Sequence, residues 1–212
     1  MTTISYDGVQ DYITSLVPSR ELELKKMEEI AEKKDFPIIG PACGYYCYQL
    51  ARMINARSVF ELGSGYGYST AWFARAVREN GGGVVHHTVW DDDLSKQAQK
   101  HLSALGSADL VKFHNAEAVE TLRQTPGPFD IIFNDIDKDG YPDSLPVIKG
   151  KLRSGGLLII DNMLWHGQTL DPNDHDSSTE AIRRFTWDIT TDPDWIVSLA
   201  PMRDGMIVAY KK

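Results

Sequence analysis

The sequence predicts an α/β protein with a doubly wound, mostly parallel seven-stranded sheet that ends in an antiparallel C-terminal hairpin. From residue 58 onward, short apolar runs alternate with amphipathic segments, as in repeated β-helix-β units. The apolar runs are continuous, which is typical of parallel strands buried on both faces. The last two runs are separated by a turn that contains Gly205, with no helix between them. These observations favour right-handed parallel crossovers followed by one reversed pair of strands.

Residues 1–56 are expected to hold helices and an entrance loop. Residues 6–34 carry helical patterning, first with an apolar stripe that includes Tyr12 and Leu16, then with alternating charges. Residues 36–41 are predicted to be a loop, because Pro41 lacks the amide donor needed to continue a helix. Helical patterning returns at 45–56.

Residues 57–212 are expected to form the core of the same domain, since a chain of 212 residues fits one domain by the rough prior of about 150 residues per domain. The predicted strands cover 58–62, 84–89, 110–114, 129–133, 157–160, 195–199 and 206–210. Helices are predicted near 68–79, 94–105, 116–123 and 143–152. His86 and His87 interrupt the second strand, and we interpret them as surface residues of that strand.

Composition and charge exclude several classes of protein. Thirty acidic against 22 basic side chains give a net charge of −8, which would repel nucleic acid. No apolar run approaches the roughly 18 residues of a membrane-spanning helix, and the N-terminus lacks the pattern of a signal peptide. Cys43 and Cys47 are the two cysteines and form no disulfide framework. We therefore expect a cytoplasmic protein with no nucleic-acid or membrane partner.

A glycine-rich turn follows the first predicted strand. Gly63, Gly65 and Gly67 permit positive φ and close approach of a ligand to the amides that begin the next helix. Glycines alone are weak evidence, because a tight turn requires the same residues. Glu61 strengthens the case, since a carboxylate there would repel the pyrophosphate of a dinucleotide and attract the positive charges of S-adenosylmethionine. S-adenosylmethionine is favoured, and a nicotinamide cofactor remains the alternative.

An acid also follows the second predicted strand. Asp91 stands where a carboxylate can accept hydrogen bonds from both ribose hydroxyls of a nucleoside cofactor. A simple helix cap is the competing interpretation of the same residue.

Oxygen-bearing side chains follow the fourth and fifth predicted strands. Asp135 comes after one strand, and Asp161 and Asn162 come after the next. Because neighbouring parallel strands end at the same edge of a sheet, these oxygens can converge on a hard cation such as Mg²⁺. Acidic strand ends without a metal are also common, so the residues alone leave both interpretations open.

Lys138, three residues beyond Asp135, is a candidate general base. A divalent cation nearby would push the lysine toward its neutral form by like-charge repulsion, and a neutral amine can take a proton from a hydroxyl. The alternative is an ordinary solvated loop lysine.

Three motifs in this order resemble the cation-dependent O-methyltransferases, which include the catechol and caffeoyl-CoA O-methyltransferases. They are Glu-x-Gly-x-x-x-Gly-Tyr-Ser from Glu61, Asp-x-Asp-Lys from Asp135, and Asp-Asn-x-Leu-Trp-x-Gly from Asp161. The likeness runs from about Ile38 to Tyr210 and implies a Rossmann-like sheet with a reversed final hairpin.

The resemblance also implies roles for single residues. Those expected to hold S-adenosylmethionine are Ile39, Glu61, Gly63, Ser64, Ser69, Asp91, Ala118, Asp135 and Asp137. Asp135, Asp161 and Asn162 match the metal ligands, with Mg²⁺, Mn²⁺ or Ca²⁺ as the ion, and Lys138 matches the proposed base. Trp165 and His166 are expected at the substrate, although caffeoyl-CoA enzymes carry an asparagine where this chain has His166. A homodimer is implied as well.

The predicted function is metal-dependent transfer of the methyl group of S-adenosylmethionine to one hydroxyl of a vicinal dihydroxyphenyl compound. The cation would chelate both acceptor oxygens and lower the pKa of the attacking hydroxyl. Two alternatives stay open at this point: a nicotinamide-dependent oxidoreductase, and a non-catalytic protein that binds S-adenosylmethionine.

Overall fold

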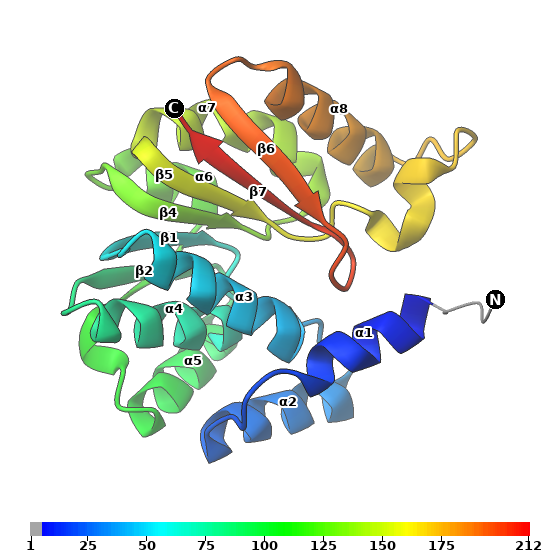
Figure 1. The fold of residues 1–212 in the computed structure, drawn as a ribbon. Helices are drawn as coiled ribbons and strands as arrows, with labels where there is room; N and C mark the ends of the chain where they lie inside the picture. The colour runs from blue at the N-terminus through cyan, green and yellow to red at the C-terminus, as the bar shows by residue number, and fades with distance from the viewer. Residues whose placement is uncertain (1–5) are drawn as a thin grey trace.

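Residues 6–212 contain one seven-stranded sheet with the strand order β3-β2-β1-β4-β5-β7-β6 (Figure 1). The structure is a computed structural model and describes residues 6–212, so the first part of the N-terminal stretch, residues 1–5, lies outside it. The strands are β1 Ser58–Leu62, β2 Val84–Val89, β3 Val111–Asn115, β4 Phe129–Asn134, β5 Leu152–Ile160, β6 Trp195–Ala200 and β7 Met206–Lys211. The first five are mutually parallel, and β7 pairs antiparallel with both β5 and β6. The predicted fold class is confirmed.

Helices cover both faces of the sheet, which is why its strands are apolar on both sides. The helices are α1 Tyr6–Ser15, α2 Leu22–Lys34, α3 Gly40–Met53, α4 Tyr68–Glu79, α5 Asp92–Ala104, α6 Ala118–Gln124, α7 Tyr141–Lys151 and α8 Ser177–Thr191. Figure 1 shows α3, α4 and α5 on one side and α6, α7 and α8 on the other. Consecutive residues of β1 enter different cores: Val59 packs with the first group and Phe60 with the second.

The N-terminal region differs from the prediction in two places. The helical pattern of 6–34 is divided into α1 and α2 around Pro18. The predicted loop 36–41 is too long, because α3 already begins at Gly40. Pro41 lies in the first turn of α3, where a helix needs no amide donor from it, so the proline starts this helix.

Helix α8 was not predicted from the sequence. Its buried residues Ile182, Phe185 and Ile189 lie on one helical stripe and pack in the second core. That spacing was present in the sequence, but the surrounding polar residues obscured it. Strand β5 also begins earlier than expected, at Leu152, and it carries Gly155 with φ +73°.

The prediction that His86 and His87 lie at the surface of the second strand is wrong. Both are buried, because β2 lies inside the sheet and is covered on each face. His86 Nδ1 lies 2.9 Å from His114 Nε2, and His87 Nδ1 lies 3.0 Å from Thr70 Oγ1. Burial lowers the pKa of His86 to about 4 and that of His87 to about 3, so both imidazoles are neutral core residues at pH 7.

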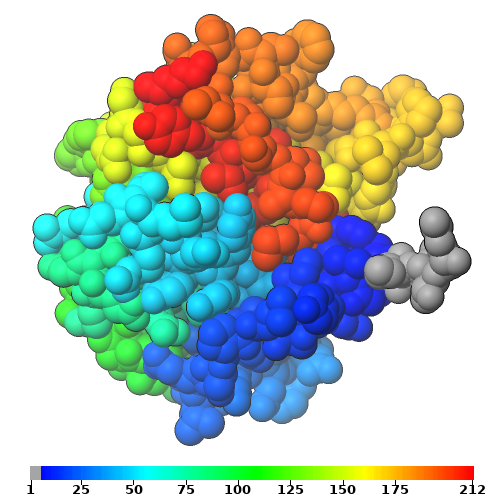
Figure 2. Space-filling model, in the orientation of Figure 1, coloured from blue at the N-terminus to red at the C-terminus, as the bar shows by residue number. Residues whose placement is uncertain are grey.

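The N-terminal helix α1 contacts the loop between β6 and β7, almost at the other end of the chain. Figure 2 shows the blue N-terminal helices against the orange-red end of this hairpin. Gln10 Oε1 accepts the backbone N–H of Arg203, and the Tyr6 hydroxyl donates to the carbonyl of Arg203. Within residues 6–212, no helix combines the length and the apolar character needed to cross a membrane.

Candidate active site

A cavity of about 1110 Å³ lies at the carboxyl ends of the parallel strands, the edge where open α/β sheets bind ligands. The predicted site residues that line it are Ile39, Gly63, Ser64, Ser69, Ala118, Asp135, Asp137, Lys138, Asn162, Trp165 and His166. Glu61 and Asp161 are fully buried and do not line the cavity, and Asp91 is exposed at the start of α5. The fold therefore gathers at one edge residues that are up to 127 positions apart, from Ile39 to His166.

The turn after β1 brings the backbone of β1 close to that of the segment after β4. Gly63 has φ +83°, and a Cβ atom at this position would lie 2.3 Å from the carbonyl oxygen of Asp135. The N–H of Asp135 donates to the carbonyl of Leu62 at 2.9 Å. Any side chain at position 63 would push these two segments apart, which explains the requirement for glycine.

Glu61 lies at the base of this turn as a buried acid near the hydroxyls of Ser69 and Thr70. It is fully buried, and neither carboxylate oxygen has a hydrogen-bond partner among residues 6–212. Burial raises the pKa of Glu61 to about 7, and the nearby hydroxyls of Ser69 and Thr70 oppose that rise. A cationic ligand in the adjoining cavity would stabilise the carboxylate, so the residue fits a positively charged cofactor.

Asp91 caps a helix, which was the alternative to its predicted contact with a ribose. Its Oδ1 accepts the N–H of Leu94 at 2.8 Å and caps α5. Contact with a ribose remains a prediction that would use the other carboxylate oxygen. Trp90, which the sequence analysis did not assign, is 77% exposed and lines the cavity beside this cap.

The acids after β4 and β5 each face a basic side chain. Lys138 Nζ donates to Asp135 Oδ1 at 2.9 Å, and Arg203 Nη1 donates to Asp161 Oδ2 at 3.1 Å. Asp161 Oδ1 is buried without a hydrogen-bond partner in the described chain. Burial, followed by the charge of Asp135, raises the pKa of Asp161 to about 7. Each acid thus has one basic partner, but one buried oxygen of Asp161 has no hydrogen-bond donor among residues 6–212.

Asn162 follows Asp161 in a left-handed conformation, with φ +61°. Its Nδ2 donates to Asp204 Oδ2 at 3.3 Å, which leaves the amide oxygen free for another partner. Asp135, Asp161 and Asn162 fit a hard cation, because all three supply oxygen and Asp161 Oδ1 has no partner among residues 6–212. Residues 6–212 contain no cluster of three His, Cys, Asp or Glu side chains suited to a metal, so the amide oxygen and non-protein oxygens would have to complete such a site.

Lys138 is held inside the site and is not a solvated loop lysine. Only 9% of the residue is exposed, and Nζ also donates to the carbonyl of Ile136 at 3.1 Å. Nζ lies 5.0 Å from the centroid of the Tyr141 ring and 5.9 Å from that of Trp165. These contacts fix the amine at the boundary between Asp135 and the cavity.

Trp165 and His166 form a strained corner of the cavity. Both have positive φ, +48° and +53°, which is unusual for residues with large side chains. The half-buried Trp165 packs against the second core, while the side chain of His166 is exposed. The backbone N–H of His166 donates to Asp204 Oδ1 at 2.6 Å, which holds the corner in place.

Comparison with known proteins identifies the family. A family model described as "O-methyltransferase" matches residues 17–212. The chain belongs to this O-methyltransferase family. Similar O-methyltransferase structures are described in complex with S-adenosylmethionine (SAM) or with SAH, so the chain is an S-adenosylmethionine-dependent O-methyltransferase, and the nicotinamide alternative is wrong.

Relatives of this O-methyltransferase are of the catechol and caffeoyl-CoA type. A catechol O-methyltransferase of Niastella koreensis is 30% identical over 186 residues, which cover 85% of this chain and 83% of the relative. A caffeoyl-CoA O-methyltransferase of Eucalyptus gunnii is 27% identical, over 97% of this chain and 88% of the relative. The structure of an O-methyltransferase from Bacillus cereus, described in complex with SAH, superimposes with a TM-score of 0.86 at 26% identity, over 96% of this chain and 97% of that one.

Besides Trp90, the sequence analysis missed Arg203 and Asp204 of this O-methyltransferase site. Both lie in the β6–β7 loop, 42 residues beyond Asp161 and Asn162, which they contact. The segment from Pro201 to Gly205 indicated only a turn, and an Arg-Asp pair in a turn gives no signal for a site. Pairing of β7 with β5 is what brings this loop to the active-site edge.

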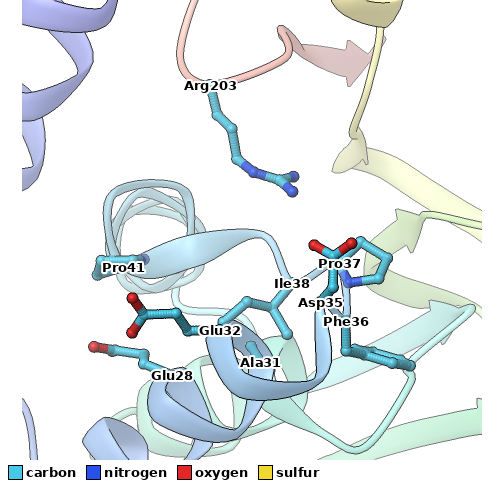
Figure 3. A pocket seen from close by; sticks show the side chains of 9 residues that line it. All are labelled: Glu28, Ala31, Glu32, Asp35, Phe36, Pro37, Ile38, Pro41 and Arg203. Carbon is cyan, nitrogen blue, oxygen red and sulfur yellow. The ribbon is translucent and has the colours of Figure 1, made fainter.

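Arg203 also borders a second, smaller pocket of about 470 Å³ in this O-methyltransferase. Figure 3 shows the arginine reaching from the hairpin toward a floor that carries Glu28, Glu32 and Asp35. Phe36, Pro37 and Ile38 line both this pocket and the large cavity, so the two openings adjoin.

Proposed function

We propose that this enzyme is divalent-cation-dependent and methylates one hydroxyl of a vicinal dihydroxyphenyl acceptor. The observation that supports it best is the buried carboxylate of Asp161, whose Oδ1 has no partner in residues 6–212 and whose pKa is raised beside Asp135. A divalent cation would supply the missing charge compensation. The names of the relatives, catechol and caffeoyl-CoA O-methyltransferases, support the class of acceptor.

One group of residues would bind S-adenosylmethionine, and a second group would bind the cation. Glu61, with the Gly63 turn, would hold the positively charged part of S-adenosylmethionine, and Asp91 its ribose. Ile39 and Ala118 would provide apolar walls, because both are nearly buried and line the cavity. Asp135, Asp161 and Asn162 would hold the cation, preferably Mg²⁺, which when bound lowers the pKa of an acceptor hydroxyl and fixes the orientation of both oxygens.

Lys138 would accept the proton of the attacking hydroxyl at Nζ. The contact of the amine with Asp135 and its burial at the edge of the cavity support this role. Trp165 would form one wall of the acceptor site, with His166 at the rim.

The test is transfer of a labelled methyl group from S-adenosylmethionine to a panel of catechols that includes caffeic acid and caffeoyl-CoA. We expect product with Mg²⁺ and its loss when a chelator is added. Product that is insensitive to the chelator would refute the cation dependence. Binding of the cofactor without methylation of any catechol in the panel would refute the acceptor class.

We also propose a homodimer in which the N-terminal helices form the interface. Helix α1 has no buried residue; Tyr12 within it and Leu16 just after its end are 65% and 63% exposed. Size-exclusion chromatography with light scattering tests this, and a monomer would refute it. A cytoplasmic location is proposed in addition, supported by the free thiols of the buried Cys43 and Cys47.

A further inference from the structure

The loop between β6 and β7 supplies a carboxylate to the cation side of the active site. Asp204 is 7% exposed, and each of its oxygens has its own hydrogen-bond donor. Oδ1 accepts the backbone N–H of His166 at 2.6 Å, and Oδ2 accepts Nδ2 of Asn162 at 3.3 Å. Asp204 therefore joins both ends of the 162–166 segment.

The orientation of the Asn162 amide is decided by the chemistry of this contact. An ionised carboxylate can only accept hydrogen bonds, so it selects the NH₂ end of the amide. The oxygen of Asn162 is then directed away from Asp204, and Asn162 lines the active-site cavity. With the amide rotated by 180°, two oxygens would face each other at Asp204, and the NH₂ group would take the place of a cation ligand.

The backbone around this contact shows that the arrangement is enforced. Asn162, Trp165 and His166 all have positive φ, which non-glycine residues adopt at an energetic cost. The N–H of Leu164 donates to the carbonyl of Asp204 at 2.8 Å, and the N–H of Met163 donates to that of Gly205 at 2.9 Å. The hairpin loop thus holds the whole segment in register.

We propose that Asp204 is a positioning residue that fixes the amide oxygen of Asn162 as a ligand of the cation. This rests on the proposed cation dependence. Asp204 itself touches neither the cation nor the acceptor, and it acts only through Asn162. Asp204 would therefore allow the amide of Asn162 to act as a ligand, although a carboxylate at position 162 would bind the cation more strongly.

The Asp204→Asn variant tests the proposal with little change in shape. The new amide can still accept the N–H of His166 with its oxygen, so its NH₂ group then faces Asn162. Asn162 must present its oxygen to this donor, which turns its own NH₂ group toward the cation site. We expect Mn²⁺ to bind about tenfold to a hundredfold more weakly, the usual range for loss of an outer-shell partner, as measured by calorimetry or by the electron paramagnetic resonance of free Mn²⁺.

The exchange variant Asn162→Asp with Asp204→Asn provides the rescue. The carboxylate introduced at position 162 would accept the NH₂ group of the new amide with one oxygen and present the other to the cation. We expect Mn²⁺ affinity to return to within about threefold of the unaltered chain, or to exceed it because a charge is added to the ligand. A purely structural role for Asp204 predicts no such recovery.

Asp171→Asn is the matched control. Asp171 also accepts a backbone N–H, that of Asn173 at 2.9 Å, in a loop outside the site, and the substitution changes the net charge equally. Its Mn²⁺ affinity should not change. The proposal for Asp204 is overturned if the Asp204→Asn variant and the unaltered chain bind Mn²⁺ equally well. It is also overturned if the variant binds Mn²⁺ weakly and the exchange variant does not restore the affinity. Neither outcome contradicts the proposed cation dependence. If Mn²⁺ does not bind to the unaltered chain, or binds equally to Asp161→Asn, the proposed cation dependence fails and this inference fails with it.

Discussion

The two halves of the active-site cavity are built in different ways. Four of the nine residues predicted to hold the cofactor, Glu61, Gly63, Ser64 and Ser69, come from one continuous stretch at a single strand-helix junction. The half predicted to hold the cation comes from three segments that are far apart in the chain, around Asp135, Asp161 and Arg203. The first half depends on a local turn, and the second depends on how β4, β5 and the hairpin loop assemble.

The difference also appears in how charge is balanced. Glu61 is buried with no hydrogen-bond partner among residues 6–212, so its pKa is raised and the site is prepared for a cationic ligand. In the other half, Lys138 and Arg203 already pair with Asp135 and Asp161. A cationic ligand beside Glu61 would displace no hydrogen-bond partner of that carboxylate among residues 6–212, whereas a cation beside Asp161 would compete with Arg203.

The Asp161→Asn substitution should have the largest effect on activity and should alter only the cation half of the cavity. The change removes one of two carboxylates from the cation side and leaves the turn at Glu61 untouched. We expect methyl transfer to fall by more than about a hundredfold, since loss of charge stabilisation in a buried site costs several kcal/mol. Binding of S-adenosylmethionine, measured by calorimetry, should stay within about twofold. Equal loss of transfer and of cofactor binding would show that the halves are not independent.

Lys138→Met should reduce the chemical step without loss of either ligand. The methionine retains the apolar stem between Tyr141 and Trp165 but removes the amine. We expect kcat to fall by about a hundredfold to ten-thousandfold, the range for a general base. Affinities for Mn²⁺ and S-adenosylmethionine should change by only a few-fold. A raised KM with an unchanged kcat would assign Lys138 to acceptor binding instead.

The same contrast explains what the sequence could predict. The glycine turn and Glu61 are recognisable because their chemistry lies within ten consecutive residues. Asp135, Asp161 and Asn162 could be predicted because strand ends are placed by the parallel topology. Arg203 and Asp204 could not, since only the pairing of β7 with β5 brings them there, and a sequence does not show which loop reaches which edge. His86 and His87 were misplaced for a related reason: the burial of β2 depends on helices elsewhere in the chain.

Cofactor affinity should depend on pH through Glu61. Burial holds its pKa at about 7, so below pH 7 the acid is protonated and a cationic cofactor must displace that proton. Affinity for S-adenosylmethionine should therefore fall as pH decreases from 7 to 5, by up to about tenfold for each pH unit. The α-ammonium of the cofactor stays protonated over this range, so the pH dependence would come from the protein, where both Glu61 and Asp161 have a pKa of about 7.

Glu61→Gln is the control for this pH dependence. Its affinity at pH 7.5 should be weaker by on the order of tenfold to a hundredfold, the value of a hydrogen bond to a charged group. Between pH 5 and 7 it should be nearly constant. A slope that persists in the variant would place the titrating group elsewhere in the site.

Substitution of Arg203 should have the smallest effect on ligand binding. The direction of the change in Mn²⁺ affinity tests whether the two halves of the cavity differ. In the absence of a cation, the guanidinium of Arg203 forms an ion pair with Asp161 Oδ2. Arg203→Met removes this competitor, so Mn²⁺ should bind several-fold more tightly, a change on the order of 1 kcal/mol. Without Mn²⁺ the variant should be less stable by roughly 1–3 kcal/mol, because Asp161 is left as a buried carboxylate without its ion-pair partner, while the partial exposure of Arg203 limits the loss.

Thermal unfolding with and without Mn²⁺ measures both parts of this prediction for Arg203. The variant should start from a lower Tm and gain more from Mn²⁺ than the unaltered chain does, since tighter binding to the folded state adds stability by mass action. Arg203→Lys keeps a positive charge at the same position and should lie between the two. If Arg203→Met instead binds Mn²⁺ more weakly, the arginine supports the cation site, and the cation half, like the cofactor half, would bind its ligand without competition.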